Sequence, residues 1–120
     1  MNPKKIMVIN THAPYGKATA RESLDAVLAA SAYDQDLSLL FLGDAVFQLL
    51  QQQDTAALEA KSLSTALPVL PLYDVTAIYA QQSALDARGL TRADLVLDVE
   101  CLENHQITAL MDSQDILLSF

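Results

Sequence analysis

The sequence has few of the residues that mark secreted, membrane-spanning or disordered proteins. Cys101 is its one cysteine, so no disulfide can form within the chain, and a lone thiol is typical of a reducing compartment. After two lysines near the amino terminus there is an apolar run of only four residues, 6–9, too short for a signal peptide or a membrane span. Three glycines and four prolines are too few for a linker-rich chain. We therefore expect a cytoplasmic protein with no membrane association.

The composition predicts one acidic domain that comprises residues 1–120. Apolar residues make up 52% of the 120 positions, enough to form a core without disulfides, and the net charge is −8. Four basic residues and no acids lie between Met1 and Arg21, whereas six acids and no bases lie between Ala93 and Phe120. Phosphate binding draws on several converging cations, so we expect no direct contact with nucleic acid. Lys17 and Arg21 are candidates for contact with an acidic protein partner.

Five short segments rich in Ile, Val, Leu and aromatic residues predict β-strands at residues 6–9, 37–42, 76–80, 95–99 and 116–120. Several are continuously apolar, as in strands that are covered on both faces. Stretches with helical signals separate them. This alternation predicts an α/β fold with a parallel sheet between two layers of helices.

The helical stretches carry recognisable end signals. Thr19–Glu22 is a capping box at the start of a helix whose apolar stripe continues through Leu24, Val27 and Leu28. Asp44 is a plausible cap for a short helix that contains Phe47. Two further helices are predicted at residues 81–88 and 103–111, the first ended by a left-handed Gly89.

The residues themselves indicate no catalytic, cofactor or metal site. The loop at residues 11–18 has one glycine and lacks the spacing of a phosphate-binding loop. Cys101 and His105 have i, i+4 spacing, but a metal site requires three or four ligands. Acids near Cys101 in the sequence, Glu100 and Glu103 among them, oppose a nucleophilic thiolate. We interpret Cys101 as a structural or incidental thiol and expect no metal and no cofactor.

Several blocks of the sequence resemble the TusC/DsrF branch of the DsrE/DsrF-like sulfur-transfer proteins. They lie in a similar order and spacing over nearly the whole chain: Ala20–Ala26, Leu28-Ala29, Asp36–Leu50, Ala13-Pro14-x-Gly16, Leu72-Tyr73-Asp74, Arg88-Gly89-Leu90 and the terminal strand ending in Phe120.

The resemblance implies a three-layer α/β/α Rossmann-like single domain with a five-stranded, mainly parallel sheet. It implies a subunit of a cytoplasmic heterohexamer with two copies each of TusB-, TusC- and TusD-like chains. Such a complex relays persulfide sulfur from a TusA-like donor to a TusE-like acceptor for 2-thiolation of the transfer-RNA wobble uridine. The sulfur-carrying paralogue has its cysteine after the third strand, where this chain has Ala80-Gln81-Gln82-Ser83. We therefore expect a non-catalytic structural subunit.

Three alternatives remain open from the sequence. The chain could serve a DsrEFH complex in sulfur oxidation, act as a sulfurtransferase through Cys101, or bind a small ligand in a flavodoxin-like manner. Interfaces often use aromatic and cationic anchors near loops. The candidates for subunit contact are therefore Tyr15, Lys17, Arg21, Phe47 and Tyr73.

Overall fold

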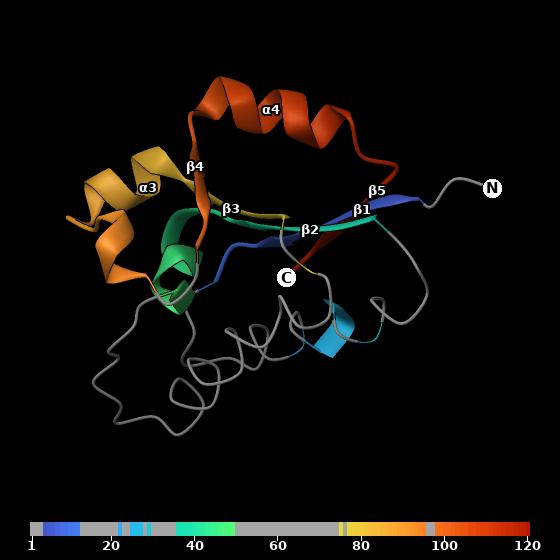
Figure 1. The fold of residues 1–120 in the computed structure, drawn as a ribbon, viewed down its shortest axis with the longest axis horizontal. Helices are drawn as coiled ribbons and strands as arrows, with labels where there is room; N and C mark the ends of the chain where they lie inside the picture. The colour runs from blue at the N-terminus through green and yellow to red at the C-terminus, as the bar shows by residue number, and fades with distance from the viewer. Residues whose placement is uncertain are drawn as a thin grey trace.

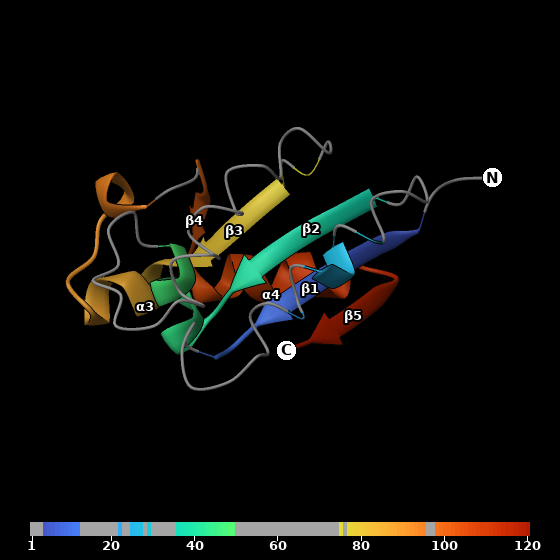
Figure 2. The same ribbon diagram turned by 90° about the horizontal axis from the view of Figure 1, so that it is seen from below.

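A computed structural model describes residues 4–12, 22, 25–27, 29, 36–49, 75, 77–95 and 98–120. Five strands form one sheet: β1 (Lys5–Asn10), β2 (Asp36–Phe41), β3 (Ala77–Gln81), β4 (Glu100–Leu102) and β5 (Ile116–Ser119). Their spatial order is β4-β3-β2-β1-β5, and each neighbouring pair is parallel (Figures 1 and 2). The predicted α/β fold with a parallel sheet is confirmed.

Helical segments cover both faces of this sheet (Figure 1). Helix α4 (Asn104–Asp112) lies on one face, and the 3-10 helix η1 (Gly43–Leu49) lies on the other together with helical residues 25–27. Helix α3 (Gln82–Ala87) follows β3, and the short 3-10 helix η3 (Arg92–Asp94) precedes β4. In the described part of the chain, no helix has the length and apolar character needed to cross a bilayer.

The alternation of side chains along the strands divides the core in two. Met7 and Ile9 of β1 pack in a cluster with Leu40 and with Ile107 of α4. Val8 of the same strand points the other way, into a larger cluster beneath η1. Apolar residues are buried on both faces because helices cover both, which explains the unbroken apolar runs in the sequence.

Four of the five predicted strands are confirmed to within a residue or so. The remaining prediction, a strand at residues 95–99, was wrong. The prediction of residues 95–99 followed the more apolar stretch, whereas β4 comprises Glu100–Leu102. Leu95 and Val99 are buried in the larger cluster without belonging to the strand. Strand pairing depends on which backbone runs beside β3, and the residues there are Glu100, Cys101 and Leu102. The apolar stretch at residues 95–99 correctly indicated a buried segment, but the pairing with β3 begins one residue later, at Glu100.

The end of α3 follows the predicted signal. Gly89 has φ +67°, its N–H donates to the Asp86 carbonyl at 3.2 Å, and the Leu90 N–H donates to the Leu85 carbonyl at 2.9 Å. This is a Schellman motif, which ends α3. Helix α4 begins with a capping box between Glu103 and Gln106.

The remaining helix predictions have mixed outcomes. The element predicted to be capped by Asp44 exists, but it is a 3-10 helix that already begins at Gly43, and Asp44 lies within its first turn. Residues 22, 25–27 and 29 are helical, and Val27 is fully buried as its place in the apolar stripe predicted. Thr19, Leu24 and Leu28 lie outside the described residues.

Candidate functional site

The carboxyl ends of β2, β3 and β4 are joined by a network of amide side chains. Gln81 ends β3, and its Oε1 accepts a hydrogen bond from the Gly43 N–H at 3.0 Å. Its Nε2 donates to Asn104 Oδ1, also at 3.0 Å, and the Ser83 hydroxyl donates to the same oxygen at 3.5 Å. One side chain thus connects the start of η1, which follows β2, with the start of α4. In the sequence, Gln81 was notable only for the lack of a cysteine at residues 80–83. These hydrogen bonds were not predicted, because they join segments 38 and 23 residues apart.

A second polar contact lies at the carboxyl end of β1. Gln48 of η1 is 2% exposed, and its Nε2 donates to the His12 carbonyl at 2.8 Å. This bond ties η1 to the segment that follows β1. The carboxyl edge of the described sheet is therefore lined by side-chain amides that bond mainly to the protein itself. Within the described ranges, no three His, Cys, Asp or Glu side chains come together as a metal site would require.

Phe47, one of the predicted interface residues, is half-buried in η1 beside an arginine. The Arg88 guanidinium carbon lies 5.7 Å from the centroid of the Phe47 ring. Arg88 Nη2 donates to Asp44 Oδ1 at 2.7 Å, and Nη1 donates to the Ala84 carbonyl at 3.0 Å. The three side chains form a surface cluster between η1 and α3 in which the arginine is fixed by charge, hydrogen bonds and the aromatic ring. The other predicted interface residues, Tyr15, Lys17, Arg21 and Tyr73, lie outside the described residues.

Cys101 lies within strand β4, whereas the strand predicted at residues 95–99 ended before it. Its half-buried side chain packs against the larger apolar cluster, and it lines a pocket of about 410 Å³ with Asp86 and Arg92 among the other lining residues. The residues before and after it in a strand project to the opposite face of the sheet. Glu100 is therefore not beside the thiol, and the charged residues among those that line the pocket with Cys101 are Asp86 and Arg92. The acids that lie near Cys101 in the sequence therefore do not represent its surroundings in the fold.

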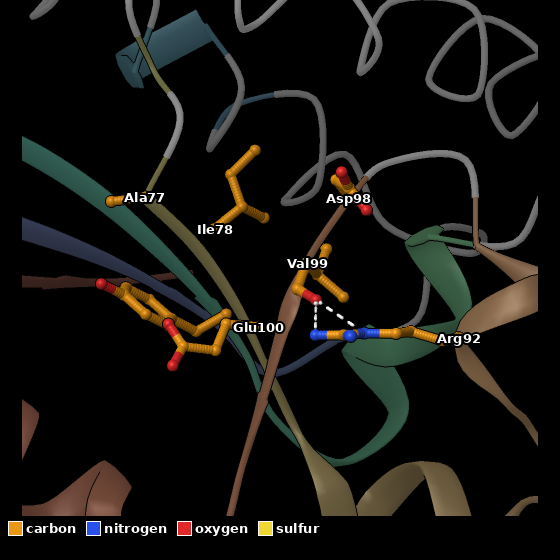
Figure 3. A pocket seen from close by; sticks show the side chains of 7 residues that line it. Ala77, Ile78, Arg92, Asp98, Val99 and Glu100 are labelled. Carbon is orange, nitrogen blue, oxygen red and sulfur yellow. Dashed lines mark hydrogen bonds between the residues drawn. The ribbon is translucent and has the colours of Figure 1, made fainter.

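Glu100 projects toward a second pocket, of about 440 Å³, at the start of β4. Figure 3 shows that Asp98, Val99 and Arg92 also line this pocket, and that the Glu100 side chain extends away from Arg92. Arg92 Nε and Nη2 donate to the Val99 carbonyl at 3.1 and 2.8 Å. The guanidinium is thus engaged with the backbone that leads into β4, and its role is to hold that backbone.

Tyr79 lines the same pocket, and its ionisation gives a test of the packing there. Burial, then the nearby carboxylates of Glu100 and Asp36, raise the pKa of Tyr79 above its ordinary value of 10.0. The folded chain therefore holds the phenolic proton more tightly than the unfolded chain. Its contribution to stability is complete below about pH 10 and is lost as the pH rises through the raised pKa.

We expect Tyr79→Phe, which has no such proton, to lose less stability than the wild type as the pH is raised. The measurement is urea unfolding of both proteins at intervals from about pH 9 to about pH 11. Equal losses in the two proteins over this interval would show that Tyr79 ionises in the folded chain as it does in water.

Comparison with known proteins identifies the family. The model of the DsrE/DsrF-like family matches residues 4–120. The chain belongs to the DsrE/DsrF-like family. Among its family relatives, a "Protein TusC homolog" from Vibrio vulnificus (strain YJ016) is 41% identical over 90% of this chain and 92% of the relative. The "Intracellular sulfur oxidation protein DsrF" of Allochromatium vinosum is 39% identical over 98% of this chain and 96% of its own.

A solved structure agrees with this DsrE/DsrF-like assignment. The crystal structure of the ychN protein from E. coli superposes with a TM-score of 0.80 and 25% sequence identity, covering 98% of this chain and 99% of the other. The family resemblance that the sequence blocks indicated is therefore confirmed, and so is the fold that it implied.

Proposed function

We propose that this chain is a non-catalytic structural subunit of a TusBCD-type sulfur-relay complex that supports 2-thiolation of the transfer-RNA wobble uridine. The observation that carries the proposal is the composition of the carboxyl end of β3. The residues there, Ala80-Gln81-Gln82-Ser83, include no cysteine, and the family resemblance implies that the sulfur-carrying paralogue has its cysteine at this place. Persulfide transfer depends on a thiolate that attacks sulfur and is attacked there, and neither an amide nor a hydroxyl can take that part.

The contacts of Gln81 support the same conclusion. Its carbonyl oxygen and its amide nitrogen are both hydrogen-bonded within the chain, to Gly43 and Asn104. A side chain so engaged connects structural elements and is not presented to a reactant. The chain would then contribute its surface to an assembly in which another subunit carries the sulfur.

The partners in this proposal are TusB-like and TusD-like subunits in a cytoplasmic heterohexamer. A TusA-like donor and a TusE-like acceptor would exchange sulfur with the complex, and this chain would make no direct contact with nucleic acid. Its net charge of −8 supports that part, since like charge opposes the approach of a phosphate backbone.

A second candidate is a subunit of a DsrEFH-type complex in sulfur oxidation. It is favoured by the 39% identity to a protein named for intracellular sulfur oxidation, which is close to the 41% identity to the TusC homolog. Both candidates assign a non-catalytic role to this chain, so they differ in the partners and not in the chemistry of the chain.

Affinity purification of the tagged chain from its host tests the proposal. We expect two co-purifying chains of similar size, one of them with a cysteine at the position of Gln81 to Ser83, and loss of wobble-uridine thiolation when the gene is deleted. Co-purification with unchanged thiolation and impaired sulfur oxidation would favour the second candidate. Recovery of the chain without such partners would contradict both.

Cys101 provides the test against a sulfurtransferase role. We expect Cys101→Ser in the assembled complex to leave the rate of sulfur transfer within about twofold of the wild type, because no step requires this thiolate. Mass spectrometry of the chain after incubation with a persulfide donor is the second measurement. Persulfide on Cys101, together with a large loss of transfer in the variant, would establish this chain as a sulfur carrier.

A further inference from the structure

The two edges of the sheet differ in how they are protected from pairing with another chain. β4 forms one edge, comprises three residues and includes the exposed Glu100. Arg92 donates two hydrogen bonds to the carbonyl of Val99, immediately before this strand. Short edge strands and charged side chains are devices by which proteins prevent edge-to-edge association.

β5 forms the other edge (Figure 2). With four residues it is also short, but unlike β4 it carries no charged side chain. Its residues are Ile116, Leu117, Leu118 and Ser119, with no charge, proline or glycine among them. Leu117 is 45% exposed and Leu118 is 40% exposed, and they are the exposed large apolar residues of the described chain. Since successive side chains of a strand project to opposite faces, the edge is apolar on both faces.

The hydrogen bonds to β1 show which backbone groups of this edge face outward. The Phe120 N–H donates to the Ile9 carbonyl at 2.8 Å, and the Phe120 carbonyl accepts from the Thr11 N–H at 2.9 Å. Backbone groups alternate between the two sides of a strand. The N–H and C=O groups of Leu118 therefore also face β1, while those of Leu117 and Ser119 face away from it. Among the described strands, β1 is the one that pairs with β5.

We propose that β5 pairs in antiparallel orientation with β5 of a second copy of this chain, around a two-fold axis at Leu118. In this register Leu117 lies opposite Ser119 of the other copy, and these two residues can exchange both of their outward hydrogen bonds. By symmetry, Ser119 of the first copy and Leu117 of the other copy exchange the same two hydrogen bonds. The two five-stranded sheets then form one continuous sheet.

The side chains in this register complement themselves, as a two-fold contact requires. Leu118 meets Leu118 at the axis, and Ile116 meets Phe120 of the other copy, all on the face of the larger cluster. The nearest acid, Asp115, lies outside the paired stretch, and its carboxylate accepts the Lys5 N–H at 2.8 Å in its own chain. The paired stretch therefore brings no like charges together across the two-fold axis, and it contains no charge that would need an opposite charge on the partner. These features favour a second copy as the partner of this edge.

The test measures self-association of the purified full chain by light scattering and sedimentation velocity over a concentration series. We expect the wild type to dimerise. Leu118→Lys and Leu118→Glu are each expected to weaken dimerisation by about tenfold or more, because like charges then meet at the axis. An equimolar mixture of the two variants should recover dimers, since lysine then faces glutamate. Ala109→Lys, on the exposed surface of α4, is the matched control and should dimerise normally.

Hydrogen exchange supplies a readout that does not depend on any variant. In the wild-type dimer the amides of Leu117 and Ser119 should exchange slowly, and dilution to monomer should make them exchange fast. A monomeric wild type, unchanged dimerisation of Leu118→Lys, or fast exchange of both amides in a dimer would each overturn the inference. The assay uses no other subunit, so its result is distinguishable from success or failure of the proposed sulfur-relay role.

Discussion

Phe47→Ala is expected to weaken binding of this chain to the TusB-like or TusD-like partner that we propose for it by about thirtyfold, which corresponds to about 2 kcal/mol. The half-buried ring of Phe47 lies beside Arg88, and Asp44 fixes the arginine by an ion pair at 2.7 Å. Aromatic and arginine side chains held in place in this way lose little freedom on binding, which is why they often dominate the affinity of an interface. The measurement is a calorimetric titration of the chain with each purified partner.

The comparison of binding with stability decides what Phe47 does. Phe41→Leu is the control, since Phe41 is 1% exposed within β2, and its truncation should lower the melting temperature with little change in affinity. If Phe47→Ala behaves like this control, with normal assembly and reduced thermal stability, then Phe47 is a core residue and the assignment to an interface is wrong.

Leu40→Ala is expected to lower the free energy of unfolding by about 2–5 kcal/mol. Leu40 is 0% exposed, and the register places it between Ile9 of β1 and Tyr79 of β3. It packs in the cluster with Ile107, which attaches α4 to the sheet. A cavity at this point removes contacts on three sides. Denaturant unfolding of the purified variant measures the loss.

Leu40→Met is the matched control for this effect. It keeps most of the side-chain volume, so we expect it to cost less than about 1.5 kcal/mol. A loss for Leu40→Ala that is no larger than the loss for Leu40→Met would mean that α4 settles into the space, and that the packing of this face is looser than the burial of Leu40 indicates.

The sequence was most informative about segments whose signals are local. The end of α3 at Gly89 was predicted, because its Schellman motif depends on residues within one helical turn. Short apolar segments marked four of the five strands. Some of these segments are continuously apolar because helices cover both faces of the sheet. The family was identifiable from the order and spacing of residue blocks, and this carried the fold with it.

The candidate site could be predicted only where composition was sufficient. The lack of a cysteine at residues 80–83 can be read from the sequence, and it carries the proposed non-catalytic role. The hydrogen bonds of Gln81 could not be anticipated, since Gly43 and Asn104 are separated from it by 38 and 23 residues. The ion pair of Arg88 with Asp44 spans 44 residues and was equally hidden.

The sequence by itself determined that this is an acidic α/β domain of the DsrE/DsrF-like family with no cysteine at residues 80–83. Tertiary structure alone decided where β4 begins, which face Cys101 occupies and which edge of the sheet is unprotected. The physical reason is the same in each case. Local signals act through the backbone within a turn or a strand. The pairing of strands and the surroundings of a side chain depend on which distant segments the packed core brings together.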